Sequence, residues 1–373
     1  MRILYVANLA SGFIRKFNIP EILYFRKNGW EVDIACGMDA PIPEASHCYD
    51  MKWKRNPFSF RVIVGIFKLH HLLNSKHYDI VYSMTPVGGL AGRLSVPFSK
   101  KKRPATIYFA HGFHFYRGSG LLSWLLYYPV EKTLSRRTDL LITTNQEDYS
   151  ISTTKFHAKK YYITNELGIS IDRFSNAVIS KNEVEQYKSE LNCGNMFPIL
   201  MYSAEISKTK NQKYLLFVLK KLKRDGYNPL LLLAGRDMSS GKFGKIIKVN
   251  DLSDNVRLLG FRNDIPKILL VSDYYVASSI REGLGLSVVE AMASGVLVFA
   301  VDNRGSRTII QNEKNGFLFS KKYPDSMAEK IEEMINDKQT SKRLIANAKV
   351  DAKKYDFSEV FPKLFSEYTS VIK

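Results

Sequence analysis

The sequence has no apolar run long enough to cross a membrane as a helix. A spanning helix needs about 20 consecutive apolar residues, whereas the longest candidates, Val62–Leu73 and Leu121–Val130, are shorter and carry polar side chains at intervals. The apolar start, residues 1–10, is also too short for a secretory signal. It leads into a polar turn, Asn8–Arg15, and therefore predicts a first buried strand.

Cysteine is scarce as well. The three cysteines, Cys36, Cys48 and Cys193, show no C-x-x-C spacing of the kind that holds a metal. Their odd number fits a reduced compartment. Together with the missing apolar span, this predicts a cytoplasmic location.

Several nucleotide-binding and metal-binding signatures are missing. No G-x-G-x-x-G follows the first strand, which argues against a dinucleotide-dependent enzyme. Gly235–Phe243 has one residue too many for a P-loop and Phe in the place of the magnesium-binding hydroxyl. There is no Asp-x-Asp triplet, so we expect neither a catalytic metal nor another cofactor.

Acidic residues are too few to balance the basic ones. The chain has 55 Lys and Arg against 36 Asp and Glu, a net charge of +19. Part of the excess is local, because residues 51–103 hold 11 basic residues and one acidic residue, Asp79. Localised positive charge indicates an anionic partner. Nucleic acid, anionic lipid and nucleotide sugars are all candidates.

Short apolar runs alternate with helical patterns, and the alternation starts again halfway along the 373 residues. This predicts two α/β domains with doubly wound parallel sheets. We expect domains at 1–175 and 176–356, a hinge near Asp172–Lys188, and a final helix, Phe357–Lys373, that packs back on the first domain. The expected strands are Ile3–Ala7, Val32–Cys36, Ile80–Met84, Thr106–Ala110, Leu140–Thr144, Ile199–Ser203, Leu230–Ala234, Val256–Leu259, Tyr274–Ser278 and Val296–Val301.

The most informative segment follows the strand that ends at Ser278. A loop with two glycines leads into a helix that stops at Gly295, a residue suited to a helix C-terminus. The backbone N–H groups of Leu286–Val288, at the start of this helix, form a site for a diphosphate. Glu282 and Glu290 flank it. The alternative is that Glu290 only closes a capping box with the serine three residues before it, and that Glu282 is a solvated loop residue.

Taken as a whole, Ser278–Gly295, with its Glu-Gly, Glu-Ala-Met-Ala and Ser-Gly elements, resembles the signature of family 4 glycosyltransferases of the capsule and exopolysaccharide type. These are retaining enzymes of the GT-B fold. The resemblance implies two Rossmann-like domains facing each other across a cleft, with the acceptor on the first and the nucleotide sugar on the second. It implies that Glu282 meets donor-sugar hydroxyls, that Glu290 holds the ribose, and that Gly283, Leu286 and Ser287 contact the donor.

Other segments carry the same resemblance. Lys210 aligns with the lysine that binds the donor diphosphate, whereas Glu205 stands where many members have a phosphate-binding arginine. Gly260-Phe261-Arg262 is similar to the loop whose backbone meets the nucleobase.

Tyr108–Tyr116 resembles the His-Gly loop of polysaccharide glycosyltransferases. It implies a functional His111, with His114 and Tyr116 on the acceptor side. Asp302–Gly305 is interpreted equally well as a turn or as a ligand contact.

The function that follows from the resemblance is transfer of a hexosyl group from a nucleotide diphosphate sugar, by expectation a UDP-sugar. The acceptor is a sugar hydroxyl of a lipid-linked saccharide in bacterial capsule, exopolysaccharide or O-antigen synthesis. One alternative is a nucleotide-sugar epimerase of the same fold, which would need acid/base carboxylates on both faces of the sugar. A second is a basic nucleic-acid-binding protein, which the charge alone supports. We favour the transferase, with no nucleic acid partner.

A peripheral position on the inner face of the plasma membrane is a further expectation. Lys52, Lys54 and Arg55 surround Trp53, Lys100–Arg103 follow Val96–Phe98, and Leu121–Tyr128 adds leucines and aromatic residues. Cations beside apolar side chains suit an anionic bilayer. The alternative is a solvated basic face with Trp53 and Trp124 in the core.

Overall fold

The computed structural model describes residues 1–54, 59–97, 103–177 and 180–372. It contains two compact units: unit 1 is Met1–Gly168 with Phe357–Lys373, and unit 2 is Ile169–Asp356. The first unit therefore ends at Gly168 and not at residue 175. The reason is that the backbone N–H of Ile169 donates to the carbonyl of Tyr355, at 2.8 Å, which ties this stretch to unit 2. The stretch in which a hinge was expected contains α6 (Asp172–Ser175) and part of α7 (Lys181–Glu190).

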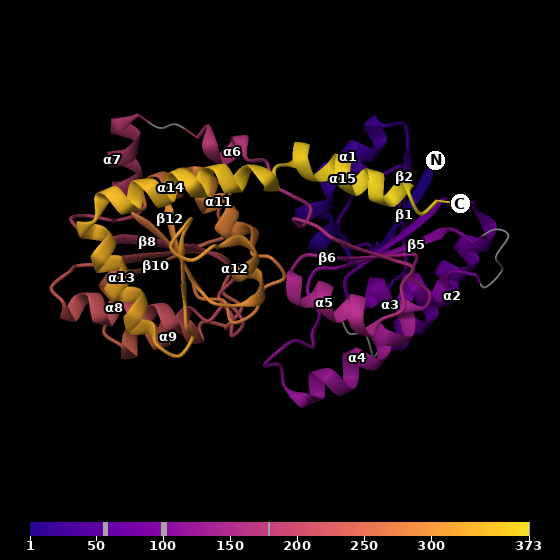
Figure 1. The fold of residues 1–373 in the computed structure, drawn as a ribbon, viewed down its shortest axis with the longest axis horizontal. Helices are drawn as coiled ribbons and strands as arrows, with labels where there is room; N and C mark the ends of the chain where they lie inside the picture. The colour runs from indigo at the N-terminus through magenta and orange to yellow at the C-terminus, as the bar shows by residue number, and fades with distance from the viewer. Residues whose placement is uncertain (55–58, 98–102, 178–179, 373) are drawn as a thin grey trace. The chain divides into compact units, whose positions relative to one another are not determined.

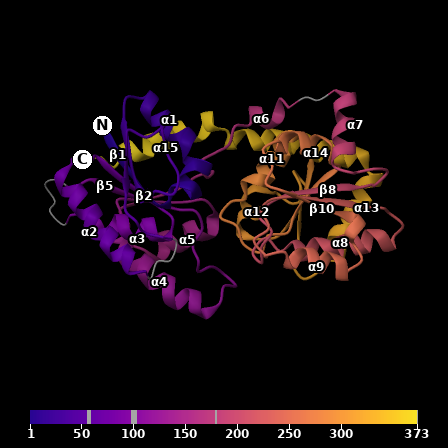
Figure 2. The same ribbon diagram turned by 180° about the vertical axis from the view of Figure 1, so that it is seen from behind.

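Unit 1 is built on a seven-stranded parallel sheet with the order β3-β2-β1-β4-β5-β6-β7 (Figure 1). Alternate residues of β1 enter different cores: Ile3 and Tyr5 pack with the helix α1 and the returning helix α15, whereas Leu4 and Val6 pack under α2 and α3. Helices α2, α3 and α4 lie on the face opposite α1 and α15 (Figures 1 and 2). The strands are β1 (Arg2–Leu9), β2 (Glu31–Gly37), β3 (His47–Asp50), β4 (Ile80–Met84), β5 (Ala105–Ala110), β6 (Leu140–Thr143) and β7 (Lys160–Ile163).

The helices of unit 1 include those expected from apolar residues at helical spacing, α1 and α2. None of the helices that the structure describes is long and apolar enough to cross a membrane. The helices are α1 (Ile19–Lys27), α2 (Phe60–Ser75), α3 (Pro86–Ser95), α4 (Leu121–Ser135), α5 (Gln146–Lys155) and α15 (Phe357–Thr369).

Unit 2 has a six-stranded parallel sheet with the order β10-β9-β8-β11-β12-β13. Helices α11 and α14 lie on one side of it, and α8 and α9 on the other (Figures 1 and 2). The order reverses between β8 and β11, which is where doubly wound sheets bind ligands. The strands are β8 (Ile199–Ser203), β9 (Leu230–Ala234), β10 (Val256–Gly260), β11 (Tyr274–Ala277), β12 (Leu297–Val301) and β13 (Phe317–Phe319).

In the part of the chain that the structure describes, seven more helices of unit 2 follow α6 and α7. They are α8 (Gln212–Arg224), α9 (Lys242–Val249), α10 (Ile265–Leu270), α11 (Leu286–Ser294), α12 (Arg304–Ile309), α13 (Pro324–Asn336) and α14 (Lys338–Ala352).

The ten expected strands are confirmed, with ends that differ by at most two residues. The polar turn expected at Asn8–Arg15 is wrong: β1 runs to Leu9, and a π-helical segment, Ala10–Asn18, follows it. Three strands, β3, β7 and β13, were not expected. They are short, with three or four residues each. β3 and β7 are at most half-buried and lack a long apolar run, whereas β13 is apolar but only three residues long.

Candidate active site

Two loops at the reversal point of unit 2 bring Lys210 and Glu282 together. Lys210 follows β8 and Glu282 follows β11, two strands that are neighbours in the sheet although the residues are 72 positions apart. The Lys210 Nζ lies 2.5 Å from the Glu282 Oε1. Both side chains keep part of their surface exposed. The site therefore offers a cation and a carboxylate side by side at the sheet edge where ligands are expected.

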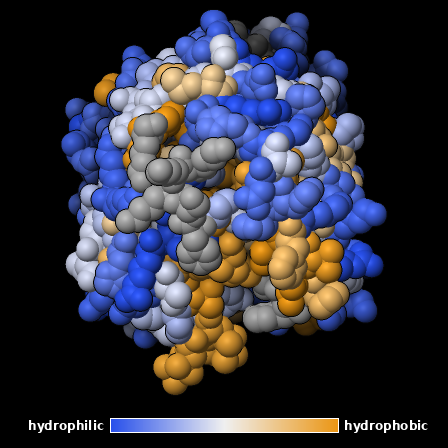
Figure 3. All heavy atoms as spheres, turned by 90° about the vertical axis from the view of Figure 1, so that its right-hand side faces the viewer, coloured by the Kyte–Doolittle hydropathy of each residue, from blue (hydrophilic) through white to orange (hydrophobic). Residues whose placement is uncertain are grey.

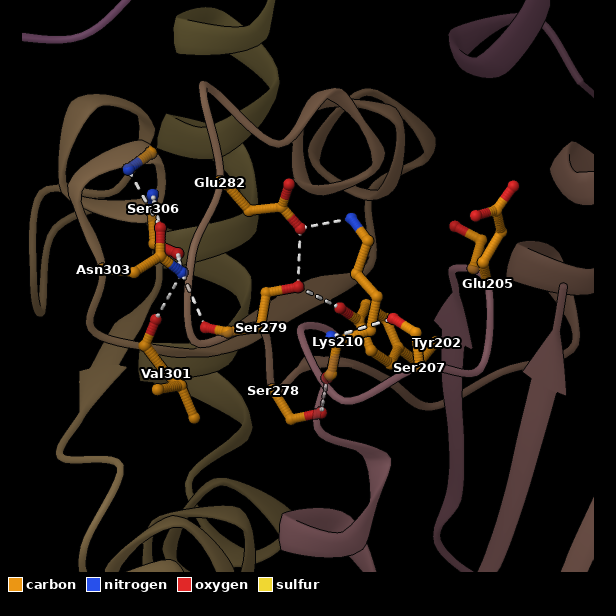
Figure 4. A network of polar contacts seen from close by, with 12 residues as sticks. Tyr202, Glu205, Ser207, Lys210, Ser278, Ser279, Glu282, Val301, Asn303 and Ser306 are labelled. Atoms are coloured by element: carbon orange, nitrogen blue, oxygen red, sulfur yellow. Dashed lines mark hydrogen bonds and ion pairs between the residues drawn. The ribbon is translucent and has the colours of Figure 1, made fainter. Parts of the chain in front are cut away.

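Hydrogen bonds from buried groups hold this pair in place (Figure 4). The Ser279 hydroxyl donates to the same Glu282 Oε1, at 2.5 Å, and lies 2.6 Å from the hydroxyl of the buried Tyr202. The Ser278 hydroxyl donates to the carbonyl of Lys210, at 2.8 Å, and so joins the two loops. Their geometry is thus fixed from the core side, which is the preorganisation that a charge-stabilising site needs.

The segment after β12 supports the Glu282 loop from the other side. Asn303 donates to the carbonyl of Ser279, at 2.9 Å, and the guanidinium of Arg304 donates to the carbonyl of Glu282, at 3.1 Å. A Cβ added to Gly305 would lie 2.7 Å from the Glu282 Cβ and 2.7 Å from the carbonyl oxygen of Leu284. Asp302–Gly305 therefore packs against the loop that carries Glu282, and the close approach requires glycine.

The start of α11 differs from the expected capping box. The N-cap is Gly285, with φ +92°, and no side chain caps the helix, so Ser287 lies one residue inside it. Glu290 is therefore not a capping residue. Of the three amides expected to face a ligand, that of Val288 donates to the carbonyl of Gly285, at 2.9 Å. Gly295 ends the helix with φ +77°, as predicted.

Glu290 lies on α11 and has a raised pKa. Burial of its carboxyl raises its pKa to about 7, and Arg173 partly offsets this. Burial deprives the ionised carboxylate of water, so hydrogen bonds donated by ligand hydroxyl groups would stabilise it. Glu290, Leu286 and Ser287 come from one helix start, and Gly283 lies in the loop before it.

The loop predicted to meet a nucleobase follows β10. Gly260 ends the strand with φ +64°. Phe261 is exposed, and the Arg236 guanidinium lies 5.3 Å from its ring centre. The Arg262 guanidinium is bound to Asp264, with Nε 2.7 Å from Oδ1, so this side chain is held back on its own loop.

In unit 1, His111 follows β5 as expected and has a partner that the sequence did not indicate. Its Nδ1 bonds the carboxylate of Glu166, which follows β7. The imidazole packs against Phe13 and Phe109, with ring centres 4.0 and 4.2 Å away. Phe13 belongs to the π-helical segment after β1. Neither Glu166 nor Phe13 was predicted, because neither lies in a sequence motif that indicates a functional role.

The other two expected residues of this loop lie beside α4. His114 stacks on Tyr127, with ring centres 4.5 Å apart. The backbone N–H of Tyr116 donates to the Ser119 hydroxyl, at 3.1 Å. Just before His114, the loop is anchored by the buried Asp148, which accepts from the backbone N–H of Phe113 at 3.0 Å. His111 and His114 are thus on one loop with different partners.

Within the described ranges, no three or more His, Cys, Asp or Glu side chains are grouped so as to hold a metal ion.

Comparison with known proteins gives consistent results. Residues 2–145 match the family model "Glycosyl transferase 4-like", and residues 183–351 match "Glycosyl transferases group 1". The protein named glycosyltransferase EpsD of Bacillus subtilis (strain 168) is 31% identical over 99% of this chain and 96% of its own length. An Escherichia coli enzyme, UDP-Gal:alpha-D-GlcNAc-diphosphoundecaprenol alpha-1,3-galactosyltransferase, is 27% identical over 88% of this chain and 86% of its own.

Solved structures show the same fold. The crystal structure of Anabaena HepE in complex with UDP and glucose covers 99% of this chain and 100% of its own, with a TM-score of 0.79 and 19% identity. WaaG, a glycosyltransferase involved in lipopolysaccharide biosynthesis, covers 98% of this chain and 99% of its own, with a TM-score of 0.75 and 16% identity.

The two Rossmann-like units therefore have the GT-B fold, and the family models and the EpsD relative define the chain as a glycosyltransferase. More narrowly, the chain belongs to the family that joins a 4-like first domain to a group 1 second domain, and its relatives include bacterial polysaccharide enzymes such as the capsular glycosyltransferase CapM of Staphylococcus aureus.

Proposed function

We propose that this glycosyltransferase moves a hexosyl group from a UDP-sugar to a hydroxyl of a lipid-linked saccharide, with retention at the anomeric carbon. The product would belong to a bacterial capsule, exopolysaccharide or O-antigen. The observation that carries the proposal is the Lys210–Glu282 pair at the reversal point of unit 2, beside the start of α11. The donor and acceptor classes are supported by the E. coli relative, whose name specifies UDP-Gal and a diphosphoundecaprenol acceptor.

The proposed chemistry centres on the leaving group. The bond from the anomeric carbon to the β-phosphate oxygen breaks, and its electron pair leaves with UDP. A bond to the acceptor oxygen forms on the same face, and the hydroxyl proton passes to the departing phosphate. Lys210 and the N-terminal end of α11 stabilise the charge that grows on the diphosphate. Glu282 accepts hydrogen bonds from sugar hydroxyls and Glu290 from the ribose.

The assay uses the purified full chain, a panel of UDP-sugars and an undecaprenyl-diphosphate-linked N-acetylhexosamine, with the product analysed by mass spectrometry and its anomeric configuration by NMR. We expect transfer with retention, and equal rates with and without EDTA because no metal is proposed. Donor incubated alone should stay unchanged, whereas an epimerase would convert it. Inversion, or release of the epimer, would contradict the proposal.

We also propose that unit 1 lies on an anionic membrane surface where lipid-linked acceptors are found. Four apolar side chains of α2, at helical spacing, are 47–74% exposed: Phe60, Ile63, Val64 and Phe67. On α4, Leu121, Leu122, Leu125, Leu126 and Val130 are 42–74% exposed. Figure 3 shows apolar side chains gathered low on this face, with a group projecting at its lower edge.

Charge complementarity favours lipid as the partner of these two helices. Residues 51–137 hold fifteen Lys and Arg against two Asp and Glu, a net of +13. Trp53 is buried in the core, as the alternative interpretation predicted, and Trp124 packs on Phe115. Arg103 pairs with Asp139, at 2.8 Å. Arg55, Phe98 and Lys100–Lys102, which were also expected to contact the membrane, lie outside the described residues. The apolar stripe on α2 replaces Trp53 in the proposed surface.

Vesicle flotation tests this surface. The chain should bind vesicles of phosphatidylcholine with phosphatidylglycerol, and salt should release it. Changing Phe67 and Leu122 together to Glu should weaken binding about tenfold or more, because two apolar side chains lose their burial. Phe217→Glu, an exposed apolar residue of unit 2, is the matched control. Unchanged binding of the double variant would contradict the proposal. So would a wild-type protein that is a dimer in solution and a double variant that is a monomer, because a second copy of the chain would then cover these side chains.

A further inference from the structure

Glu166 is the partner of His111, and its placement is unusual. The carboxylate is 6% exposed and bonds the His111 Nδ1 across 55 positions of sequence. Two strands of the unit 1 sheet end close together here, β5 before His111 and β7 before Glu166. A buried carboxylate on one ring nitrogen fixes which nitrogen carries the proton.

The other ring nitrogen of His111 is left for a ligand. Nε2 is buried and has no hydrogen-bond partner among the residues that the structure describes. Because Phe13 and Phe109 pack on the ring, the imidazole cannot turn to bond elsewhere without losing these contacts. A buried acceptor without a partner is costly, so such groups are commonly found where a ligand binds.

The backbone at Glu166 is strained in a way that the sheet does not require. Its φ is +59°, in the left-handed region, where glycine is the residue without steric cost. The hydroxyl of Thr164 donates to the carbonyl of Glu166, at 3.1 Å, and holds the turn. A side chain is thus kept at a position that glycine would stabilise, which indicates that the carboxylate itself is needed.

We propose that Glu166 is a positioning residue: its carboxylate accepts a hydrogen bond from the Nδ1–H of His111, so that the unprotonated Nε2 accepts a hydrogen bond from a sugar hydroxyl during transfer. The identity of the hydroxyl as a sugar hydroxyl rests on the proposed function, whereas the tautomer of the His111 imidazole does not. The hydrogen bond from His111 to Glu166 favours the tautomer with the proton on Nδ1 and fixes the orientation of the ring toward the ligand. Without Glu166 both tautomers would be populated, and only a fraction of molecules would present an acceptor.

The experiment combines NMR of the histidine ring nitrogens with kinetics on the full chain, in wild type, Glu166→Gly and Glu166→Gln. The His111 signals are assigned by their loss in His111→Asn. Glycine removes the carboxylate and suits a φ of +59°, so the variant should not unfold more easily. Glutamine keeps the acceptor oxygen but removes the charge. Glu313→Gly is the matched control, because Glu313 also has a positive φ, +62°, but is exposed in unit 2.

We expect wild-type His111 to carry its proton on Nδ1 when neutral, and Glu166→Gly to shift the ring nitrogens toward a mixture of tautomers. Its kcat should fall about 10- to 100-fold, as for other buried partners of functional histidines, while UDP affinity and thermal midpoint are kept. Glu166→Gln should keep the tautomer and lose less. Unchanged ring shifts or an unchanged kcat in Glu166→Gly would overturn the inference. If wild type transfers no sugar, the proposed function fails, whereas the ring shifts still test the hydrogen bond from His111 to Glu166.

Discussion

Lys210 and Glu282 contact each other, and each neutralises the charge of its partner. A donor diphosphate would compete for the ammonium, and sugar hydroxyls would compete for the carboxylate. The two side chains are therefore expected to act on different parts of one substrate. Their effects on catalysis should be separable, because one interaction grows as the leaving group departs and the other holds the sugar in place.

Lys210→Ala should lower turnover by about 10²- to 10³-fold, the range for losing one charge-stabilising donor, and should weaken UDP binding. Glu282→Gln should cut turnover by about 10²-fold while UDP binding stays close to wild type, because the proposed partner of this side chain is the sugar of the donor and not its uridine or phosphates. Initial rates and calorimetric titration with UDP check both.

Lys208→Ala is the control for Lys210, since Lys208 is exposed in the same loop. If Lys210→Ala leaves both rate and UDP affinity unchanged, the phosphates bind elsewhere. Near-normal turnover of Glu282→Gln would remove Glu282 from the donor site.

At the scale of elements, the start of α12 braces the loop between β11 and α11. The bracing depends on Gly305, because its Cα lies against the backbone and side chain of the Glu282 segment. Asn303 caps α12 by accepting from the backbone N–H groups of Gly305 and Ser306, at 2.9 and 3.1 Å. The same asparagine donates to Ser279, so one residue positions both the helix and the loop.

Gly305→Ala should displace Glu282 and lower turnover, because the added methyl overlaps two groups at 2.7 Å. Overpacking of this kind costs about 1–3 kcal/mol of stability. Gly244→Ala in α9, where a Cβ would meet nothing within 4 Å, is the matched control and should stabilise by about 0.4–1 kcal/mol. Chemical denaturation and initial rates measure the two effects; a Gly305→Ala enzyme of wild-type rate would show that α12 does not hold the loop.

At the scale of the whole molecule, the chain's last helix returns to unit 1 and meets a buried acid. The Tyr368 hydroxyl of α15 donates to the Glu21 Oε1, and the Asn18 side-chain amide donates to Oε2, both at 3.0 Å. Burial raises the pKa of Glu21 to about 7, and these hydrogen bonds offset only part of the rise. The folded state therefore binds a proton that the unfolded chain has already released.

Stability should consequently fall as the pH rises from about 4.5 to about 7, because the folded state holds more protons in this window. The contribution of Glu21 is on the order of 3 kcal/mol, and Glu290 acts in the same direction. Glu21→Gln should flatten the curve and raise stability above pH 7, with Glu313→Gln as an exposed control. Denaturation midpoints across pH check this; equal slopes in Glu21→Gln and wild type would contradict it.

The sequence by itself determined the two parallel sheets and the loops to inspect. Strands buried on both faces, such as Ile80–Met84 and Leu230–Ala234, must be continuous apolar runs, and such runs are visible without a structure. Loops after them are at the carboxyl edge by the rules of chain connection, so the loops could be located in advance. The resemblance to family 4 glycosyltransferases then singled out Lys210, Glu282 and His111 within these loops. Edge strands such as Lys160–Ile163 are half-solvated and give no such signal.

Only the tertiary structure decided which of these side chains meet. The Lys210–Glu282 and His111–Glu166 pairs join residues 72 and 55 positions apart, and their contacts depend on strand order and on where each loop bends. It also decided that Gly285 is the N-cap of α11, so that Glu290 is not part of a capping box but a carboxyl group on the helix with a raised pKa. Local sequence sets periodicity and burial, whereas partners and acidity are set by what the fold places against each group.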